Sequence, residues 1–124
     1  MGTKVVLWLF VIVTIAGRPT TASDGLALKA SPAMAMAPAE LTVRVTVETD
    51  AGNRSLAVIA ESEGFYRSSQ ITLDGGNAPR TNVFQFPDMP AGRYNVTSIL
   101  RRANGKQLSA SQGVVFASGA GSPH

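Results

Sequence analysis

The side chains most often used for catalysis are scarce in this sequence. Its only histidine, His124, is the last residue, and there is no cysteine. A histidine at the very end of a chain cannot be held in a Ser-His-Asp arrangement, and the lack of cysteine excludes thiol catalysis and cysteine-bound metals. No zinc-protease, P-loop or dinucleotide-binding motif occurs either. The sequence therefore predicts that the protein is not an enzyme and that it holds no metal or other cofactor.

Two pairs of carboxylates are the nearest approach to acid–base chemistry. Glu48 and Asp50, and likewise Glu61 and Glu63, are two residues apart, a spacing that places both groups on one side of a strand. Glycoside hydrolysis uses such pairs when they flank a cleft. Each pair here borders a predicted turn, where solvated charges are common. We interpret both pairs as solvated strand ends.

Two further sets of side chains offer possible metal ligands. Asp74, Asn77 and Asp88 carry the oxygen atoms that Ca²⁺ prefers, but their spacing is not that of an EF-hand. Asp and Asn are also the usual residues of turns. Met34 and Met36 are two thioethers, which alone make a poor metal site. We interpret both sets as structural or incidental.

A cluster of residue types that anchor interfaces lies at a turn-to-strand junction. Phe65, Tyr66 and Arg67 follow each other there, and aromatic and arginine side chains contribute strongly to binding at protein interfaces. Successive residues of a strand face opposite ways, so at least one ring is expected outside the core. Arg80, beyond the following loop, could complete a ligand-binding surface. The alternative is that one ring faces the core and its neighbour covers the sheet edge.

The elements that must position these residues are predicted to be strands. Between Leu41 and Val47, apolar and polar residues alternate strictly, with β-branched residues on both faces. Asn104-Gly105 is a strong hairpin signal, and Gln112-Gly113 indicates a bulge. A spacing of about 8–12 residues between turn signals is typical of a β-sandwich. The other expected strands are Ser55–Ser62, Phe65–Leu73, Thr81–Phe86, Tyr94–Leu100 and Gln107–Ala117, with a possible seventh between residues 74 and 81.

Residues 1–22 have the pattern of a secretory signal peptide. Lys4 is followed by the apolar run Val5–Ala16 and by small residues that end in Ala22. The run is shorter than the roughly 18–20 residues that a membrane-spanning helix needs. We therefore expect export to the periplasm or the cell exterior, with no membrane span after signal removal. An uncleaved anchor is the alternative.

The rest of the chain is expected to form one domain between less ordered ends. Residues 23–39 are rich in Ala, Pro and Met and are predicted to be a flexible linker, and residues 118–124 a disordered tail. Residues 40–117 are predicted to form a single antiparallel β-sandwich of six to seven strands. Signal removal lowers the net charge from +3 to +1. The charge pattern is not that of a nucleic-acid-binding protein.

One segment resembles a motif of several sandwich families. Met89-Pro90-Ala91-Gly92-Arg93-Tyr94-Asn95-Val96 is similar to the Leu-Pro-x-Gly-x-Tyr-x-Val entry to a late strand in immunoglobulin-like, fibronectin-type-III-like and carboxypeptidase-regulatory-like domains. The resemblance covers residues 40–117 and implies that Tyr94 forms a tyrosine corner, with its ring in the core and its hydroxyl bonded to upstream backbone. The cysteine pair and core tryptophan of antibody domains are missing. The resemblance implies a non-catalytic interaction or spacer domain.

These observations together predict a non-catalytic exported β-sandwich module that binds a protein or a cell-envelope component. One alternative is a carbohydrate-binding accessory domain that uses Tyr66 or Phe65 with Arg67. Another is a structural subunit that assembles through exposed sheet edges, for which residues 40–50 and 107–117 are the candidates. The expected partner is a protein or a cell-envelope glycan, and the oligomeric state is left open.

Overall fold

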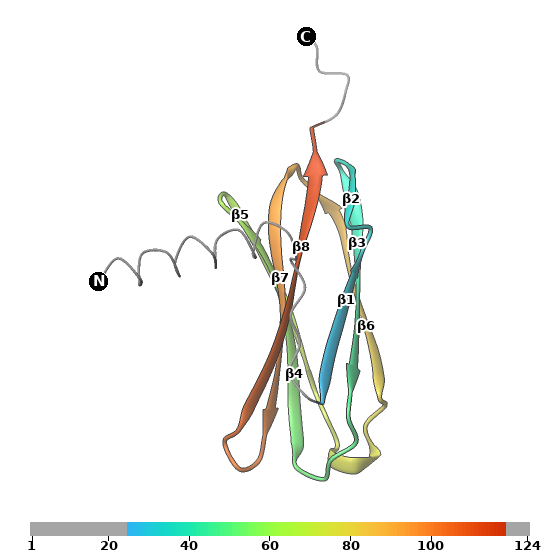
Figure 1. Cartoon of the computed structure of the whole chain (residues 1–124), viewed down its shortest axis with the longest axis vertical. Coiled ribbons are helices and arrows are strands. Elements are labelled where there is room, and N and C mark those ends of the chain that lie inside the picture. Colours follow the sequence, from blue (N-terminus) through green and yellow to red (C-terminus); the bar gives the residue numbers. More distant parts are fainter. Residues whose placement is uncertain (1–24, 119–124) are drawn as a thin grey trace, which may run out of the picture.

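The computed structural model describes residues 25–118, which form two β-sheets that pack face to face (Figure 1). This part of the chain contains eight strands and one short 3₁₀ helix, η1 (Gly75–Asn77). The all-β class predicted from the period-two pattern is confirmed, with more strands than expected. The small sheet has the order β1 (Leu26–Ser31), β3 (Ala39–Val47), β6 (Thr81–Met89), and the large sheet has the order β2 (Met34–Met36), β8 (Gln107–Ala117), β7 (Gly92–Arg102), β4 (Asn53–Ser62), β5 (Phe65–Thr72).

The core lies between the two sheets and is built from alternate residues of each strand. In β3 and β4 every second side chain is buried, because a strand directs successive side chains to opposite faces. The alternation expected between Leu41 and Val47 is therefore confirmed. The buried apolar side chains with the largest volume and the least exposure are Phe116, Leu41, Leu56, Met89, Leu100, Val43, Val45, Val58, Val96 and Val114.

The predicted flexible linker at residues 23–39 is wrong for the described part of that stretch. Leu26, Leu28 and Ala30 alternate with polar or exposed residues, and β1 buries all three against β3 in an antiparallel pair. After Ser31 the chain crosses to the other sheet, where β2 pairs in parallel with β8. The prolines do cut the stretch into short pieces, but tertiary pairing makes those pieces strands.

Three other local expectations differ from the structure. The residues between β5 and β6 contain η1 rather than a seventh strand. β6 continues through Pro87 to Met89, which is possible because an edge strand does not need every backbone N–H. The register between β7 and β8 is continuous across Gln112-Gly113, so there is no bulge there.

The expected assembly edge at residues 40–50 is wrong, because β3 lies between β1 and β6 and is paired on both sides. The expected edge at residues 107–117 is wrong for the end of β8, where β2 pairs with residues 115–117. The outermost strands of the two sheets are instead β1 and β6, and β2 and β5. Sequence periodicity carries no information on which strands become outermost.

The Gln112 side chain connects β8 to β1 by forming the two backbone hydrogen bonds that a neighbouring strand would form. Gln112 points toward the interior and accepts a hydrogen bond from the Ala30 backbone N–H at 2.9 Å. Its amide nitrogen donates to the Ala30 carbonyl oxygen at 2.8 Å. The pair of bonds satisfies both backbone groups of a residue at the small sheet's edge and ties the two sheets together.

Ser98 is a polar residue in the middle of the core. Its side chain is fully buried between Val58 and Ala110 in the β4–β7–β8 ladder, and its hydroxyl has no hydrogen-bond partner among residues 25–118. An unpaired buried hydroxyl costs about 1–3 kcal/mol. We therefore expect Ser98→Ala to raise the free energy of unfolding by about 1 kcal/mol in urea denaturation. Ser68→Ala, at an exposed position, serves as the control and should change it by less than about 0.5 kcal/mol. A loss of stability in Ser98→Ala would contradict this reading.

The predicted signal peptide at residues 1–22 and the predicted tail after Ser118 lie outside the described residues, as does His124. Within residues 25–118 there is no helix with the length and apolar character needed to cross a membrane.

Candidate functional site

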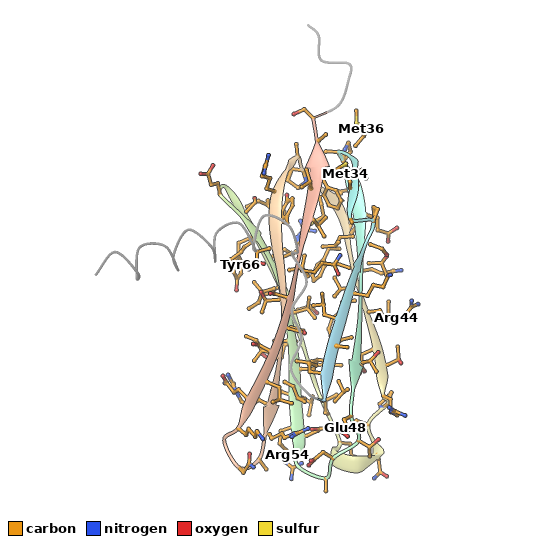
Figure 2. The ribbon with its side chains drawn as sticks, viewed as in Figure 1. Met34, Met36, Arg44, Glu48, Arg54 and Tyr66 are labelled. Carbon is orange, nitrogen blue, oxygen red and sulfur yellow. The ribbon has the colours of Figure 1, made fainter. Side chains whose placement is uncertain are left out.

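Most of the large exposed apolar side chains of the described residues lie on one face. Four large apolar residues are exposed, and three of them, Tyr66, Met34 and Met36, belong to the large sheet, with exposed fractions of 62%, 73% and 52%. The strand registers from β5 through β4, β7 and β8 to β2 place the side chains of Tyr66, Met34 and Met36 on the same side of the sheet, pointing away from the core. Figure 2 shows Tyr66 on β5 and the methionines on β2, the two edge strands of this sheet. We call this side of the large sheet the outer face.

The middle of the outer face is uncharged. Two neighbouring rows of side chains cross β5, β4, β7 and β8, and both contain small, hydroxyl, amide or aliphatic side chains only. The isoleucines at the centre of the rows, Ile59 and Ile99, are partly exposed. Charged residues begin only at the ends of the sheet. The first row is Ser68, Ile59, Thr97 and Ser111, and the second is Gln70, Ala57, Ile99 and Ser109.

Of the predicted ligand-binding cluster, only Tyr66 is presented on this face. Phe65 points inward, and its ring meets that of Tyr94 edge-on, with the ring centroids 6.1 Å apart. The Arg67 guanidinium lies 5.1 Å from the centre of the Phe65 ring and donates a hydrogen bond to the Pro87 carbonyl at 3.2 Å. Phe65 and Arg67 therefore fill the space between β5 and β6. Their inward direction agrees with the alternation of side chains along a strand.

The structure does not bring Arg80 to this cluster, and the expectation that it completes the surface is corrected. Arg80 precedes β6, where its carbonyl oxygen accepts a hydrogen bond from the Val47 N–H at 2.7 Å. Figure 1 shows that the connection from β5 to β6 lies at the opposite end of the sandwich from the β4–β5 turn. Phe65 follows that turn, so the length of β5, roughly 25 Å for eight residues, separates the two positions.

Tyr94 joins the aromatic residues at the β4–β5 end of the sandwich. Its ring packs between the rings of Phe65 and Phe116. The centroids of the Tyr94 and Phe116 rings are 5.7 Å apart. Its hydroxyl donates a hydrogen bond to the Pro90 carbonyl at 2.7 Å, four residues upstream. Burial raises the pKa of Tyr94 above its ordinary value of 10.0 and outweighs the opposing effects of Ser62 and Arg67.

A shallow hollow lies at the same end, between the β4–β5 turn and the start of β7. It encloses about 550 Å³ and is lined by Ser62, Glu63, Gly64, Ala91, Gly92 and Arg93. Glu63 and Arg93 are both exposed on its rim. The hollow borders the outer face rather than forming a separate enclosed site.

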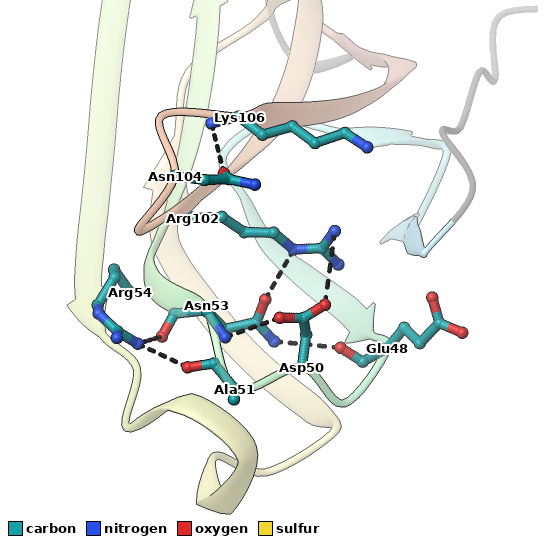
Figure 3. A network of polar contacts seen from close by, with 9 residues as sticks. Glu48, Asp50, Ala51, Asn53, Arg54, Arg102, Asn104 and Lys106 are labelled. Carbon is teal, nitrogen blue, oxygen red and sulfur yellow. Dashed lines mark hydrogen bonds and ion pairs between the residues drawn. The ribbon is translucent and has the colours of Figure 1, made fainter.

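Polar residues at the other end of the sandwich form a network that holds two turns together (Figure 3). Asn53 is buried, donates to the Glu48 carbonyl at 3.1 Å and accepts from Arg102 Nε at 3.1 Å. Asp50 accepts from the Gly52 N–H at 2.7 Å and lies 3.8 Å from Arg102 Nη1. The sequence analysis did not predict this role of Asn53. Its position at the end of a turn was the signal that could have indicated it.

The remaining acidic residues do not converge on one site. Asp74 precedes η1 and Asn77 is its last residue, whereas Asp88 lies at the far end of β6, next to Met89. The Asp50 carboxylate is paired with Arg102 in the network at the turns. Among residues 25–118, no group of three His, Cys, Asp or Glu side chains is placed to hold a metal ion.

No protein-family model and no curated protein sequence matches this chain. Solved structures do match its fold. Superoxide reductase (neelaredoxin) from Ignicoccus hospitalis has a TM-score of 0.60 and 16% identity, over 82% of this chain and 85% of that one. The PmoD soluble domain from Methylocystis has a TM-score of 0.53 and 11% identity, over 84% of this chain and 99% of that one. A family 76 glycoside hydrolase from Bacteroides thetaiotaomicron matches at 0.50 and 18% identity, over 80% of this chain but 20% of that one.

These neighbours correct the expectation that the protein is not an enzyme. That expectation relied partly on the sandwich being a fold of non-catalytic modules, and neelaredoxin is an enzyme with a fold that matches most of this chain. The identity to the superoxide reductases is 11–16%, so the likeness establishes the fold and not the reaction.

Proposed function

We propose that the protein is an exported recognition module that binds a protein or a cell-envelope component through the outer face of its large sheet. The observation that carries the proposal is that three of the four large exposed apolar side chains of the described residues lie on this face. They lie on the two edge strands of the sheet, and the partly exposed Ile59 and Ile99 lie on the strands between them. Contiguous exposed apolar surface is typical of interaction sites. Tyr66 supplies a rigid aromatic anchor, and Met34 and Met36 supply flexible apolar contacts.

The strand order and the tyrosine contact favour an immunoglobulin-like type of sandwich. β1 pairs with β3 in the small sheet. β2, which lies between them in the sequence, pairs with β8 in the large sheet. The bond from Tyr94 to the Pro90 carbonyl has the geometry of a tyrosine corner. Domains of this type commonly act in recognition, which agrees with the proposed use of the outer face. The signal-like residues 1–22 support export.

Binding to the outer face is tested by capture from the native cell envelope with the wild-type chain and two single variants. Tyr66→Ala removes the exposed ring, and we expect it to lower the affinity for the captured partner by at least about tenfold. Val83→Ala is the matched control because Val83 is 50% exposed but lies on the small sheet. Affinities are then measured by calorimetry with the purified partner.

An equal loss of affinity in the two variants would show that the outer face is not the binding site. A partner held equally by all three proteins would also overturn the assignment, because Tyr66 is the largest exposed apolar side chain on the outer face. Circular dichroism of each variant separates loss of binding from loss of fold.

Carbohydrate is a second candidate ligand because of what surrounds Tyr66. Ser68 and Gln70 are exposed and lie on the same side of β5 as Tyr66, so hydroxyl and amide groups follow the aromatic ring along the strand. A glycan array probed with the wild-type chain and with Tyr66→Ala tests this. Binding to a defined sugar that disappears in the variant would support it, and an array without signal would exclude it.

A further inference from the structure

β5 is a sheet edge without the features that usually protect one. Edge strands are normally shortened, bulged, or interrupted by proline or lysine, since their free backbone groups would otherwise pair with another chain. β5 has eight residues, contains neither proline nor lysine, and pairs with β4 without a register shift. Its one charged side chain, Arg67, is turned away to the Pro87 carbonyl. Ser68, Ser69 and Gln70 are all exposed.

The other outermost strands differ from β5 in this respect. β2 has three residues and lies between Pro32 and Pro38. β6 contains Pro87, and Asp88 interrupts it with a positive φ of 55°. β1 carries Lys29 at an exposed position, and the Gln112 side chain already forms hydrogen bonds with the backbone N–H and carbonyl of Ala30. Of the four outermost strands, only β5 offers a long and unobstructed row of backbone donors and acceptors.

We propose that β5 pairs antiparallel with β5 of a second copy of this chain, with Ser68 opposite Ser68 of that copy. Opposite residues of an antiparallel pair share a face of the sheet, so a symmetric pairing must be centred on a residue and not between two residues. Centring on Arg67 would place two guanidinium groups opposite each other. Centring on Ser69 would place Arg67 opposite the apolar Ile71.

The pairing centred on Ser68 has no such conflict. It places Phe65 opposite Ile71 of the second copy, and both are partly buried residues that point inward. Tyr66 then lies opposite Gln70 of the second copy on the outer side, and Arg67 lies opposite Ser69. Aromatic–β-branched pairs stabilise antiparallel strands, and no like charges meet.

The consequence is one continuous sheet with a shared outer face. Each copy contributes a Tyr66, and both rings project from the same side because the two-fold axis is perpendicular to the sheet. Two linked binding sites raise the overall affinity for a repetitive partner by mass action. The pairing itself rests on the edge strands and does not depend on the proposed recognition function.

The test uses charge at the self-paired position. Ser68→Lys and Ser68→Glu each place two like charges opposite each other in the dimer, whereas an equimolar mixture places Lys opposite Glu. We expect the wild-type full chain to sediment with twice the monomer mass at high concentration. Each variant alone should dissociate at least about tenfold more readily, and the mixture should return to within about threefold of the wild type. Gln85→Lys, exposed on β6, is the matched control and should not change the dissociation constant.

Three results would overturn the pairing. These are a wild-type chain that stays monomeric at about 1 mM, a dimer that tolerates both single variants, and a mixture that stays monomeric while circular dichroism shows both variants folded. The register is tested separately, because the chain has no cysteine and a single thiol can be placed at will. Ser68→Cys should form an intermolecular disulfide at least about tenfold faster than Gln85→Cys, and equal rates would contradict the proposed register.

Discussion

Replacing Tyr94 by alanine is expected to lower the free energy of unfolding by about 3–5 kcal/mol. The side chain is only 3% exposed, and its ring fills the space between Phe65 and Phe116 at the β4–β5 end of the core. Alanine would leave a cavity there and would remove the hydrogen bond to the Pro90 carbonyl. Urea denaturation followed by circular dichroism measures the change.

Tyr94→Phe separates the hydroxyl from the ring. It keeps the aromatic contacts and loses the hydroxyl's bond to Pro90 and its interaction with Ser62, so we expect a loss of about 1 kcal/mol at neutral pH. A loss in Tyr94→Phe as large as that in Tyr94→Ala would mean that the hydroxyl, and not the packed ring, provides the stability. A loss below about 1 kcal/mol in Tyr94→Ala would show that this end of the core is not closely packed.

The pH dependence of stability gives an independent check on Tyr94. Burial raises the pKa of Tyr94 in the folded protein above the ordinary value of 10.0, so the folded state keeps the phenol protonated where the unfolded state loses its proton. This contribution is fully present below pH 10 and decreases as the pH rises through the raised pKa. The stability difference between wild type and Tyr94→Phe should therefore shrink above pH 10. A constant difference would contradict the raised pKa.

Asn53→Ala is expected to destabilise the protein by about 2–4 kcal/mol. Asn53 is 1% exposed, and its amide serves both the Glu48 carbonyl and Arg102 Nε. Alanine leaves the Glu48 carbonyl and the charged Arg102 donor without these bonds, at the point where the β3–β4 turn meets the end of β7 (Figure 3). Thermal and urea denaturation measure the loss.

Asn104→Ala is the matched control for this network. Asn104 accepts a hydrogen bond from the Lys106 N–H at 2.8 Å, but it is exposed in the β7–β8 turn. Its replacement should cost less than about 1 kcal/mol, because water can take the place of the lost bond. Similar losses for the two asparagines would show that burial of Asn53 does not set the strength of the network.

The local pattern of the sequence determined the strands and much of the core. The alternation from Leu41 to Val47 predicts β3 and its buried face, because side-chain direction in a strand follows from the backbone itself. Asn104-Gly105 predicts the β7–β8 turn, where Gly105 adopts a positive φ of 89°. The exposure of Tyr66 beside an inward Phe65 follows from the same alternation.

The candidate site could be predicted only in part, because its members come from strands that are distant in sequence. The outer face combines β5 with β2, whose methionines are joined to it through three intervening strands. The stretch that contains β2 was predicted to be a linker, since its prolines break any long regular segment. Arg80 was predicted to join Phe65, yet the length of β5 keeps them apart. No local pattern reports such distances.

Tertiary structure alone decided which strands are central, which are outermost and which polar groups are buried. Residues 40–50 and 107–117 have the strand-like patterns from which assembly edges were predicted, but β3 gains a neighbour on both sides and β2 pairs with the end of β8. Gln112, read in the sequence as half of a bulge signal, instead pairs with the backbone of Ala30, eighty-two positions away. Alternation fixes which way a side chain points within its own strand. Which strand lies beside it depends on contacts between distant segments, and these form only when the whole core is assembled.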